Sequence, residues 1–181
     1  MDIRTNYILP QSTGNGPGTR AVVWVQGCSI RCPGCCNLDT WDPATGSLIS
    51  VDGLISRLNL SSSVQLDGIT ITGGEPLDQY DAVIELCKKI FPLTSIFLTT
   101  GYTFLEIYKA EKFKILKYID ILCTGPFVES RITRNEWRGS DNQIISFLTS
   151  RGIELSKMPV VSKEFIIRKN GAEVLKTGFT E

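Results

Sequence analysis

The chain has 181 residues, 42% of them apolar and 21% charged, which is the composition of a globular protein with room for one domain and its core. Nineteen basic and nineteen acidic residues cancel to a formal net charge of zero, so bulk charge attracts neither nucleic acid nor an anionic membrane. No segment approaches the roughly 20 apolar residues of a membrane span, and the N-terminus has no signal-peptide core. We therefore expect one domain, residues 1–181, in the cytoplasm, with neither a nucleic-acid nor a membrane partner.

Strand and helix patterns alternate along the chain, which predicts an α/β protein. In chain order the predicted elements are a strand at 21–26, a helix at 51–58, a strand at 68–72, a helix at 80–90, a strand at 95–100, a helical stretch at 103–118 in one or two pieces, and a strand at 119–125. Asp78 is the candidate N-cap of the second helix, and Pro92 stops that helix. Segment 126–143 is polar and irregular.

The C-terminal segment 160–178 holds two strand-like runs around Asn170-Gly171, a strong turn signal that predicts a β-hairpin. The preceding strand-helix-strand units predict a mostly parallel sheet, whose binding loops gather at the carboxyl ends of the strands. Two unusual stretches follow such ends: a cysteine-rich loop after the first strand, and Gly73 to Pro76 after the second. We expect both at the same edge of the sheet.

Four of the six cysteines lie within nine residues of this loop, and the chain has no histidine. A structural zinc site usually needs two separated cysteine pairs or added histidines, so zinc fits poorly. Thiolates are the ligands of iron–sulfur clusters, and three from one loop can hold three irons of a cubane, leaving the fourth iron open to a small molecule. Cys28, Cys32 and Cys35, spaced C-x3-C-x2-C, are the candidate ligands.

The other three cysteines are interpreted as structural. Cys36 directly follows a candidate ligand and has to point away from it, so we expect a small buried residue there, with its role left open. Cys87 lies in the apolar stripe of a helix and Cys123 in an apolar strand, and both are expected to pack in the core.

The cysteine spacing together with "GGEP" resembles the radical S-adenosylmethionine (SAM) superfamily. By this resemblance the three cysteines bind a 4Fe-4S cluster, the open iron is chelated by SAM, and a second segment contacts the amino group of SAM. The resemblance also implies a partial (β/α) barrel with a mostly parallel sheet, followed here by the predicted hairpin. The implied SAM-binding segment is Gly73, Gly74, Glu75 and Pro76.

Further segments resemble the activating enzymes of anaerobic ribonucleotide reductase and their small relatives. They are "NGPGTR", "QGCSIRCPGCCN", "TITGGEPL", "TTGYT", "GPF" and "RGSDNQII". The resemblance implies that the enzyme cleaves SAM to methionine and a 5'-deoxyadenosyl radical, which abstracts a hydrogen atom from a glycine of a partner protein. It thereby also implies a polypeptide substrate and a reductant such as flavodoxin or ferredoxin.

Candidate contacts to SAM and substrate follow from these motifs. Glu75, beside two glycines that permit close backbone approach, is expected to accept a charge-assisted hydrogen bond from the SAM ammonium. Thr99 and Thr100 end the third strand, where a ribose or adenine is expected to lie. Three further residues are candidates for substrate binding: Tyr102, Arg138 and Asn142.

Two alternatives stay open. Reductase activators tend to carry histidine and asparagine in the cluster loop, where this chain has Ser29, Ile30 and Cys36. A second hypothesis is therefore a maturase of ribosomally made peptides, performing backbone excision, epimerisation or crosslinking with a separate leader-peptide-binding partner. The third is a non-enzymatic iron–sulfur redox protein, which the lack of a fourth nearby cysteine ligand disfavours.

Overall fold

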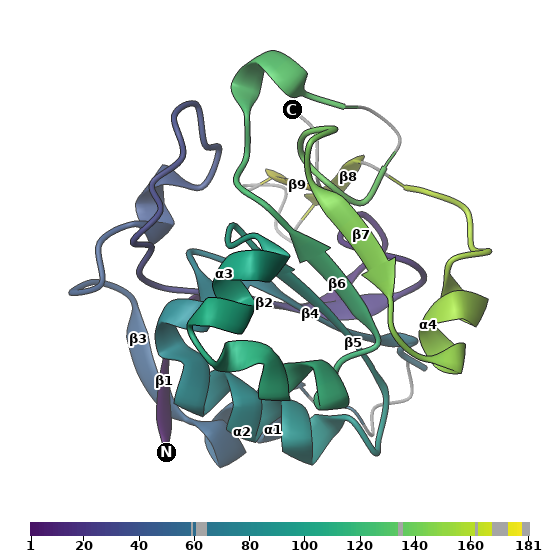
Figure 1. Cartoon of the computed structure of the whole chain (residues 1–181). Helices are drawn as coiled ribbons and strands as arrows, with labels where there is room; N and C mark the ends of the chain where they lie inside the picture. The colour runs from purple at the N-terminus through teal and green to yellow at the C-terminus, as the bar shows by residue number, and fades with distance from the viewer. Residues whose placement is uncertain (59, 61–64, 134–135, 162, 168–173, 179–181) are drawn as a thin grey trace.

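The computed structural model describes residues 1–58, 60, 65–133, 136–161, 163–167 and 174–178, and places seven strands in one sheet (Figure 1). The order across the sheet is β3-β1-β2-β4-β5-β6-β7. The strands are β1 (Asp2–Ser12), β2 (Arg20–Val25), β3 (Ser47–Ser50), β4 (Gly68–Gly73), β5 (Ser95–Thr100), β6 (Ile121–Thr124) and β7 (Ile144–Phe147). A separate antiparallel pair consists of β8 (Lys163–Ile167) and β9 (Val174–Gly178).

Helices cover one face of the large sheet, where α1 (Val51–Leu58) and α2 (Tyr80–Ile90) contribute to the main apolar core (Figure 1). The remaining helices are α3 (Phe104–Lys109), α4 (Ser150–Leu155) and the 3-10 helices η1 (Leu38–Thr40), η2 (Pro76–Gln79), η3 (Lys112–Tyr118) and η4 (Glu129–Arg131). None of the described helices has the length and apolar character needed to cross a lipid bilayer.

The alternation of side chains along β5 shows how the sheet separates two clusters. Ile96 and Leu98 are fully buried in the core under the helices, whereas Phe97 belongs to a second cluster with Ile121 and Trp137. Successive strand residues point to opposite faces, so one strand serves both clusters. The second face therefore has its own apolar packing.

The predicted α/β class and C-terminal hairpin are confirmed, although the turn residues Asn170 and Gly171 lie outside the described part of the chain. Strands β2, β4, β5 and β6 pair in parallel, as expected for the centre of the sheet. Three of the six pairings in the large sheet are antiparallel, however: β1 with β2, β1 with β3, and β6 with β7. The end strands β3 and β7 do not pair in the described structure, so the sheet is open rather than closed.

Two local predictions are resolved by the backbone. The stretch after β5 does form two helices, which break at Glu111, a residue with φ of 55°. The prediction that Asp78 caps the second helix is wrong. Glu75 caps η2 by accepting a hydrogen bond from Leu77 N at 2.8 Å, and η2 runs on into α2. The Asp78 carboxylate instead accepts a 2.7 Å hydrogen bond from Ser29 N in the cysteine loop.

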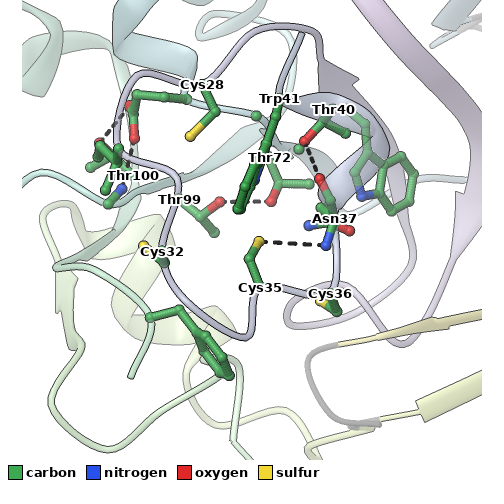
Figure 2. Close-up of a pocket in the computed structure, with 18 of the residues that line it drawn as sticks. Cys28, Cys32, Cys35, Cys36, Asn37, Thr40, Trp41, Thr72, Thr99 and Thr100 are labelled. Carbon is green, nitrogen blue, oxygen red and sulfur yellow. Dashed lines mark hydrogen bonds between the residues drawn. The ribbon is translucent and has the colours of Figure 1, made fainter. Parts of the chain in front are cut away.

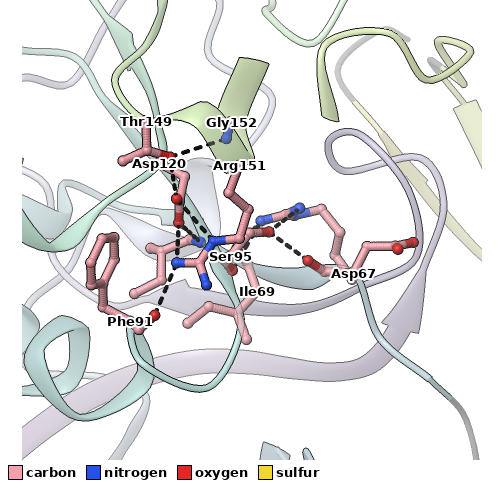
Figure 3. A network of polar contacts seen from close by, with 10 residues as sticks. Asp67, Ile69, Phe91, Ser95, Asp120, Thr149, Arg151 and Gly152 are labelled. Atoms are coloured by element: carbon pink, nitrogen blue, oxygen red, sulfur yellow. Dashed lines mark hydrogen bonds and ion pairs between the residues drawn. The ribbon is translucent and has the colours of Figure 1, made fainter. Parts of the chain in front are cut away.

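Two buried charges tie the central strands together at their amino ends (Figure 3). Arg20 at the start of β2 is fully buried and donates to Thr70 Oγ1 at 2.9 Å and to Ser95 Oγ at 3.1 Å. Burial lowers the pKa of Arg20 to about 9, so the guanidinium stays protonated at neutral pH. Asp120 accepts two hydrogen bonds from Arg151, at 3.0 and 2.9 Å. These partners offset the desolvation of both charges.

The β8–β9 hairpin is fastened to the loop that follows β1. Glu164 Oε2 accepts hydrogen bonds from Ser12 Oγ at 2.6 Å and from Thr13 N at 2.9 Å. Asn15 Nδ2 donates to Thr177 Oγ1 at 2.9 Å. These contacts link residues about 150 positions apart and hold the end of β9 beside a cavity at the carboxyl ends of the central strands.

Candidate active site

A cavity of about 620 Å³ lies where the cysteine loop and the glycine-rich turn face each other at the carboxyl ends of β2, β4 and β5 (Figure 2). Figure 2 shows the cysteine sulfurs bordering a common space, with the threonines of β4 and β5 nearby. The structure thus brings together residues that the sequence separates by more than 70 positions. Its lining includes Cys28, Cys32, Cys35, Glu75, Thr99 and Thr100.

Main-chain hydrogen bonds fasten the cysteine loop at its base. Gly27 N donates to Thr40 O at 2.7 Å, and Cys28 N donates to Trp41 O at 3.2 Å, so the loop leaves and returns beside the end of β2. Gly27 has φ of 95°, which favours glycine. The chain from 27 to 41 therefore closes on itself and turns its cysteines toward the cavity.

The three candidate ligands are free, half-buried thiols. Burial raises the pKa of the Cys28 and Cys32 thiols, so binding of a metal centre has to release their protons. Among the described residues, no group of three His, Cys, Asp or Glu side chains converges on a single metal ion. Three thiolates from one loop suit a cubane, because each thiolate binds a different iron. The donor set therefore fits a 4Fe-4S cluster better than one zinc ion.

The glycine-rich turn touches the base of the cysteine loop. Gly74 N donates to Val25 O at 2.9 Å, and Glu75 N donates to Gly27 O at 2.8 Å. A Cβ atom on Gly74 would lie 2.2 Å from Gly27 O, closer than any side chain tolerates. Gly73 has φ of 106°. Both glycines are thus required for the turn to lie directly against the cysteine loop.

Glu75 is the buried carboxyl of this site, with 1% of its surface exposed. Its Oε1 accepts hydrogen bonds from Leu77 N at 2.8 Å and Thr100 Oγ1 at 2.7 Å, and its Oε2 accepts one from Gly101 N at 2.8 Å. Burial raises the pKa of Glu75 to about 7 despite these donors. A carboxylate has about four acceptor positions. One position remains on Oε2, which fits an ammonium group placed in the cavity.

Of the other residues predicted to contact SAM or substrate, some line the cavity and some do not. Thr99 lines the cavity and donates to Thr72 Oγ1 at 2.8 Å. Arg138 also lines the cavity. Tyr102 and Asn142 do not line it: Tyr102 Oη donates to Asp78 Oδ1 at 2.9 Å, and Asn142 Nδ2 donates to Pro126 O at 2.8 Å. Pro76 is buried at the start of η2 and does not line the cavity either.

Aromatic residues that sequence reasoning did not select form other parts of the wall. Tyr7 and Trp24 line the cavity as an aromatic pair whose ring centroids are 5.9 Å apart. Trp24 pairs with Thr72 across the parallel strands, so both belong to the same face. Strand alternation relative to Thr72 is the signal that would have found Trp24; β1, which carries Tyr7, was not predicted at all. Trp41 closes the base of the cysteine loop.

The remaining three cysteines differ in how deeply they are buried. Cys87 and Cys123 are 0% and 1% exposed, so their predicted place in the core is confirmed. Cys36 is exposed and lines the cavity, so the expectation of a small buried residue is wrong. Cys36 belongs to the loop that follows β2 and borders the cavity rather than to an element packed on the core, which accounts for its exposure.

Three thiols in C-x3-C-x2-C order and a buried glycine-glycine-glutamate turn thus share one cavity at the carboxyl edge of parallel strands, which defines a radical SAM enzyme with a 4Fe-4S cluster and SAM as cofactors. The chain matches the family described as 4Fe-4S single cluster domain over residues 14–146. It belongs to the family of anaerobic ribonucleoside-triphosphate reductase-activating proteins.

The relatives behind this assignment are similar over most of their length. The activating protein of Enterobacteria phage T4 is 37% identical over 145 residues, which cover 76% of this chain and 91% of that protein. That of Escherichia coli K12 is 33% identical over 148 residues, covering 77% and 95%. The crystal structure of QueE from Escherichia coli aligns with a TM-score of 0.46 and 19% identity, over 57% of this chain and 54% of that one, and the assignment does not depend on it.

Proposed function

We propose that the chain activates an anaerobic ribonucleoside-triphosphate reductase by removing a hydrogen atom from a glycine of that protein. The observation that carries the proposal is the single cavity bordered by the three thiols and the buried Glu75. Membership of a family whose relatives bear the activating-protein name supports the choice of partner.

In this function the residues of the chain have to bind the cluster and SAM, orient them, and enclose the reacting groups. When bound, the 4Fe-4S cluster and SAM supply the electron and the 5'-deoxyadenosyl group that takes the hydrogen atom. The three thiols hold the cluster, and Glu75 orients the ammonium end of SAM through its remaining acceptor position. Thr99 and Thr100 border the space left for the ribose or adenine. Hydrogen-atom transfer needs no general base, which agrees with a chain that contains no histidine.

Arg138 is the proposed contact to the substrate polypeptide, because its side chain lines the cavity and also holds the backbone of segment 141–143. Tyr102 and Asn142 act in this proposal by positioning loops around the cavity. We further propose that residues 1–181 work as one domain in the cytoplasm, with the open sheet serving as a partial barrel around SAM. A flavodoxin or ferredoxin is the proposed reductant.

The proposal is tested with the anaerobically reconstituted protein, SAM, a reductant and the anaerobic reductase from the same organism. We expect 5'-deoxyadenosine and the electron paramagnetic resonance signal of a glycyl radical on the reductase. Cys28→Ala should abolish both, whereas Cys87→Ala, a matched change of a core thiol, should keep both. Formation of 5'-deoxyadenosine without a radical on the reductase would refute the partner and leave the peptide maturase as the working hypothesis.

A further inference from the structure

A second cavity, of about 430 Å³, lies on the outer side of the cysteine loop. Alternate residues of the loop face opposite ways: Ile30 and Cys32 line the main cavity, whereas Ser29 and Arg31 line the outer one. Cys28 lines both. The outer cavity thus reaches a cluster ligand without passing through the space that SAM and the substrate occupy.

The charged side chains that line the outer cavity differ in the hydrogen bonds that they make within the protein. Its lining includes Asp78, whose carboxylate accepts hydrogen bonds from Ser29 N at 2.7 Å and from Tyr102 Oη at 2.9 Å. Within the described part of the chain, the side chains of Arg4 and Arg31 make only long hydrogen bonds, of 3.3 and 3.4 Å, to backbone carbonyl oxygens. The carboxylate is therefore used to hold the loop, while both guanidinium groups keep donors for an external partner.

The backbone at Arg31 supports the same interpretation. Arg31 is exposed and has φ of 51°, a left-handed conformation that residues with a Cβ seldom adopt. This conformation is part of the loop that alternates its side chains between the two cavities.

We propose that the outer cavity is the docking site of an acidic one-electron carrier protein that reduces the cluster. The proposal rests on the proposed function, in which each cleavage of SAM consumes one electron. In the step itself the carrier loses one electron, the cluster gains it, and no bond forms or breaks. A carrier that docks at the outer cavity would not compete with SAM or the reductase for the main cavity.

Distance and charge select this site. Electron transfer through protein weakens steeply with distance, and Cys28 is the candidate ligand that the outer cavity exposes to a second protein. Guanidinium groups pair with carboxylates through charge-assisted, bidentate hydrogen bonds, so Arg4 and Arg31 suit an acidic surface. Complementary charges of this kind mainly raise the rate of association and make it depend on salt.

The test compares two reductants on the cluster-loaded protein. Reduced flavodoxin is the protein donor, and photoreduced 5-deazariboflavin is a small donor that needs no docking surface. The variant is Arg4→Glu/Arg31→Glu, and the matched control is Arg57→Glu/Lys157→Glu, which makes the same change of charge on exposed residues of α1 and beyond α4. Binding of oxidised flavodoxin, measured by isothermal titration calorimetry, provides a readout independent of turnover.

We expect the Arg4/Arg31 variant to bind flavodoxin about 10-fold or more weakly at low salt, and to form 5'-deoxyadenosine correspondingly more slowly with that donor. Its rate with deazariboflavin should match wild type, and the control should behave as wild type with both donors. Unchanged flavodoxin binding would overturn the proposal. An equal loss with both donors would overturn it too, because the arginines would then act on the loop itself. No 5'-deoxyadenosine from wild type with either donor would refute the proposed function instead.

Discussion

Replacing Glu75 by glutamine tests how the glycine-rich turn holds a buried carboxyl group. The pKa of Glu75 is raised from 4.5 to about 7 by burial, which means that its ionisation costs the folded state about 3 kcal/mol. Because the folded-state pKa is the higher one, the stabilising contribution is complete below pH 4.5 and is lost as the pH rises through about 7. Glutamine at this position cannot ionise and removes this loss.

The substitution also changes the hydrogen bonds. A glutamine carbonyl oxygen can still accept from Leu77 N and Thr100 Oγ1, but its amide group then faces the Gly101 N–H as a second donor. The lost bond should cost about 1–3 kcal/mol at low pH, where the wild-type carboxyl is neutral. The free-energy difference between wild type and Glu75→Gln should then shift by about 3 kcal/mol in favour of the variant from pH 4.5 to pH 8.

Urea unfolding of the cluster-free protein, followed by circular dichroism across this pH range, measures that difference. Glu154→Gln on the exposed side of α4 is the matched surface substitution. A difference that stays constant to within about 1 kcal/mol would refute the reasoning, since it would show that Glu75 titrates alike in the folded and unfolded states. A shift in favour of wild type at high pH would refute it more strongly.

Three further predictions follow from the packing. Gly74→Ala should abolish 5'-deoxyadenosine formation and lower the iron content, because its Cβ would meet Gly27 O at the base of the cysteine loop; wild-type iron loading would contradict this. Cys87→Ala should lower the free energy of unfolding, measured with urea, by about 1 kcal/mol, because it opens a small cavity in the core. A loss above about 3 kcal/mol would be inconsistent with the deletion of a single sulfur atom. Asp120→Ala should cost about 3 kcal/mol in the same assay, since Arg151 and a strand N–H lose their buried acceptor, and an unchanged urea midpoint would count against the role given to this network.

The strands of the large sheet that were predicted from the sequence are those with continuous apolar runs. The four central strands β2, β4, β5 and β6 are buried on both faces. Their sequences are therefore nearly continuous apolar runs, such as the one in β5 (Ser95–Thr100), which are easy to recognise. The strands outside this parallel centre, β1, β3 and β7, are partly exposed and mix polar with apolar residues, so no run marks them. Their pairing depends on contacts with distant strands, which a local pattern does not contain.

Some residues of the candidate site could likewise be predicted from the sequence, and others could not. The proposed cluster and SAM residues, such as Cys28 and Glu75, could be selected from the sequence because their chemistry restricts residue type and spacing, and both line the same cavity. Asp78 was misassigned because a carboxylate before a helix predicts an N-cap, while its actual partner, Ser29, is 49 residues away. The walls contributed by Tyr7 and Lys176 depend on how β1 and β9 approach the cavity, and no spacing in the sequence reports that.

The fully buried Arg20 also bears on the order in which the chain folds. Its donors reach Thr70 and Ser95, which lie 50 and 75 residues further along the chain. Removing a guanidinium from water before these acceptors are in place leaves a bare charge in an apolar interior, so we expect Arg20 to become buried only as the amino ends of β2, β4 and β5 come together. Closing such long loops is slow, and this step is a natural barrier between a collapsed chain and the native sheet. The chemistry of the cavity at the opposite ends of these strands begins only after that barrier is crossed.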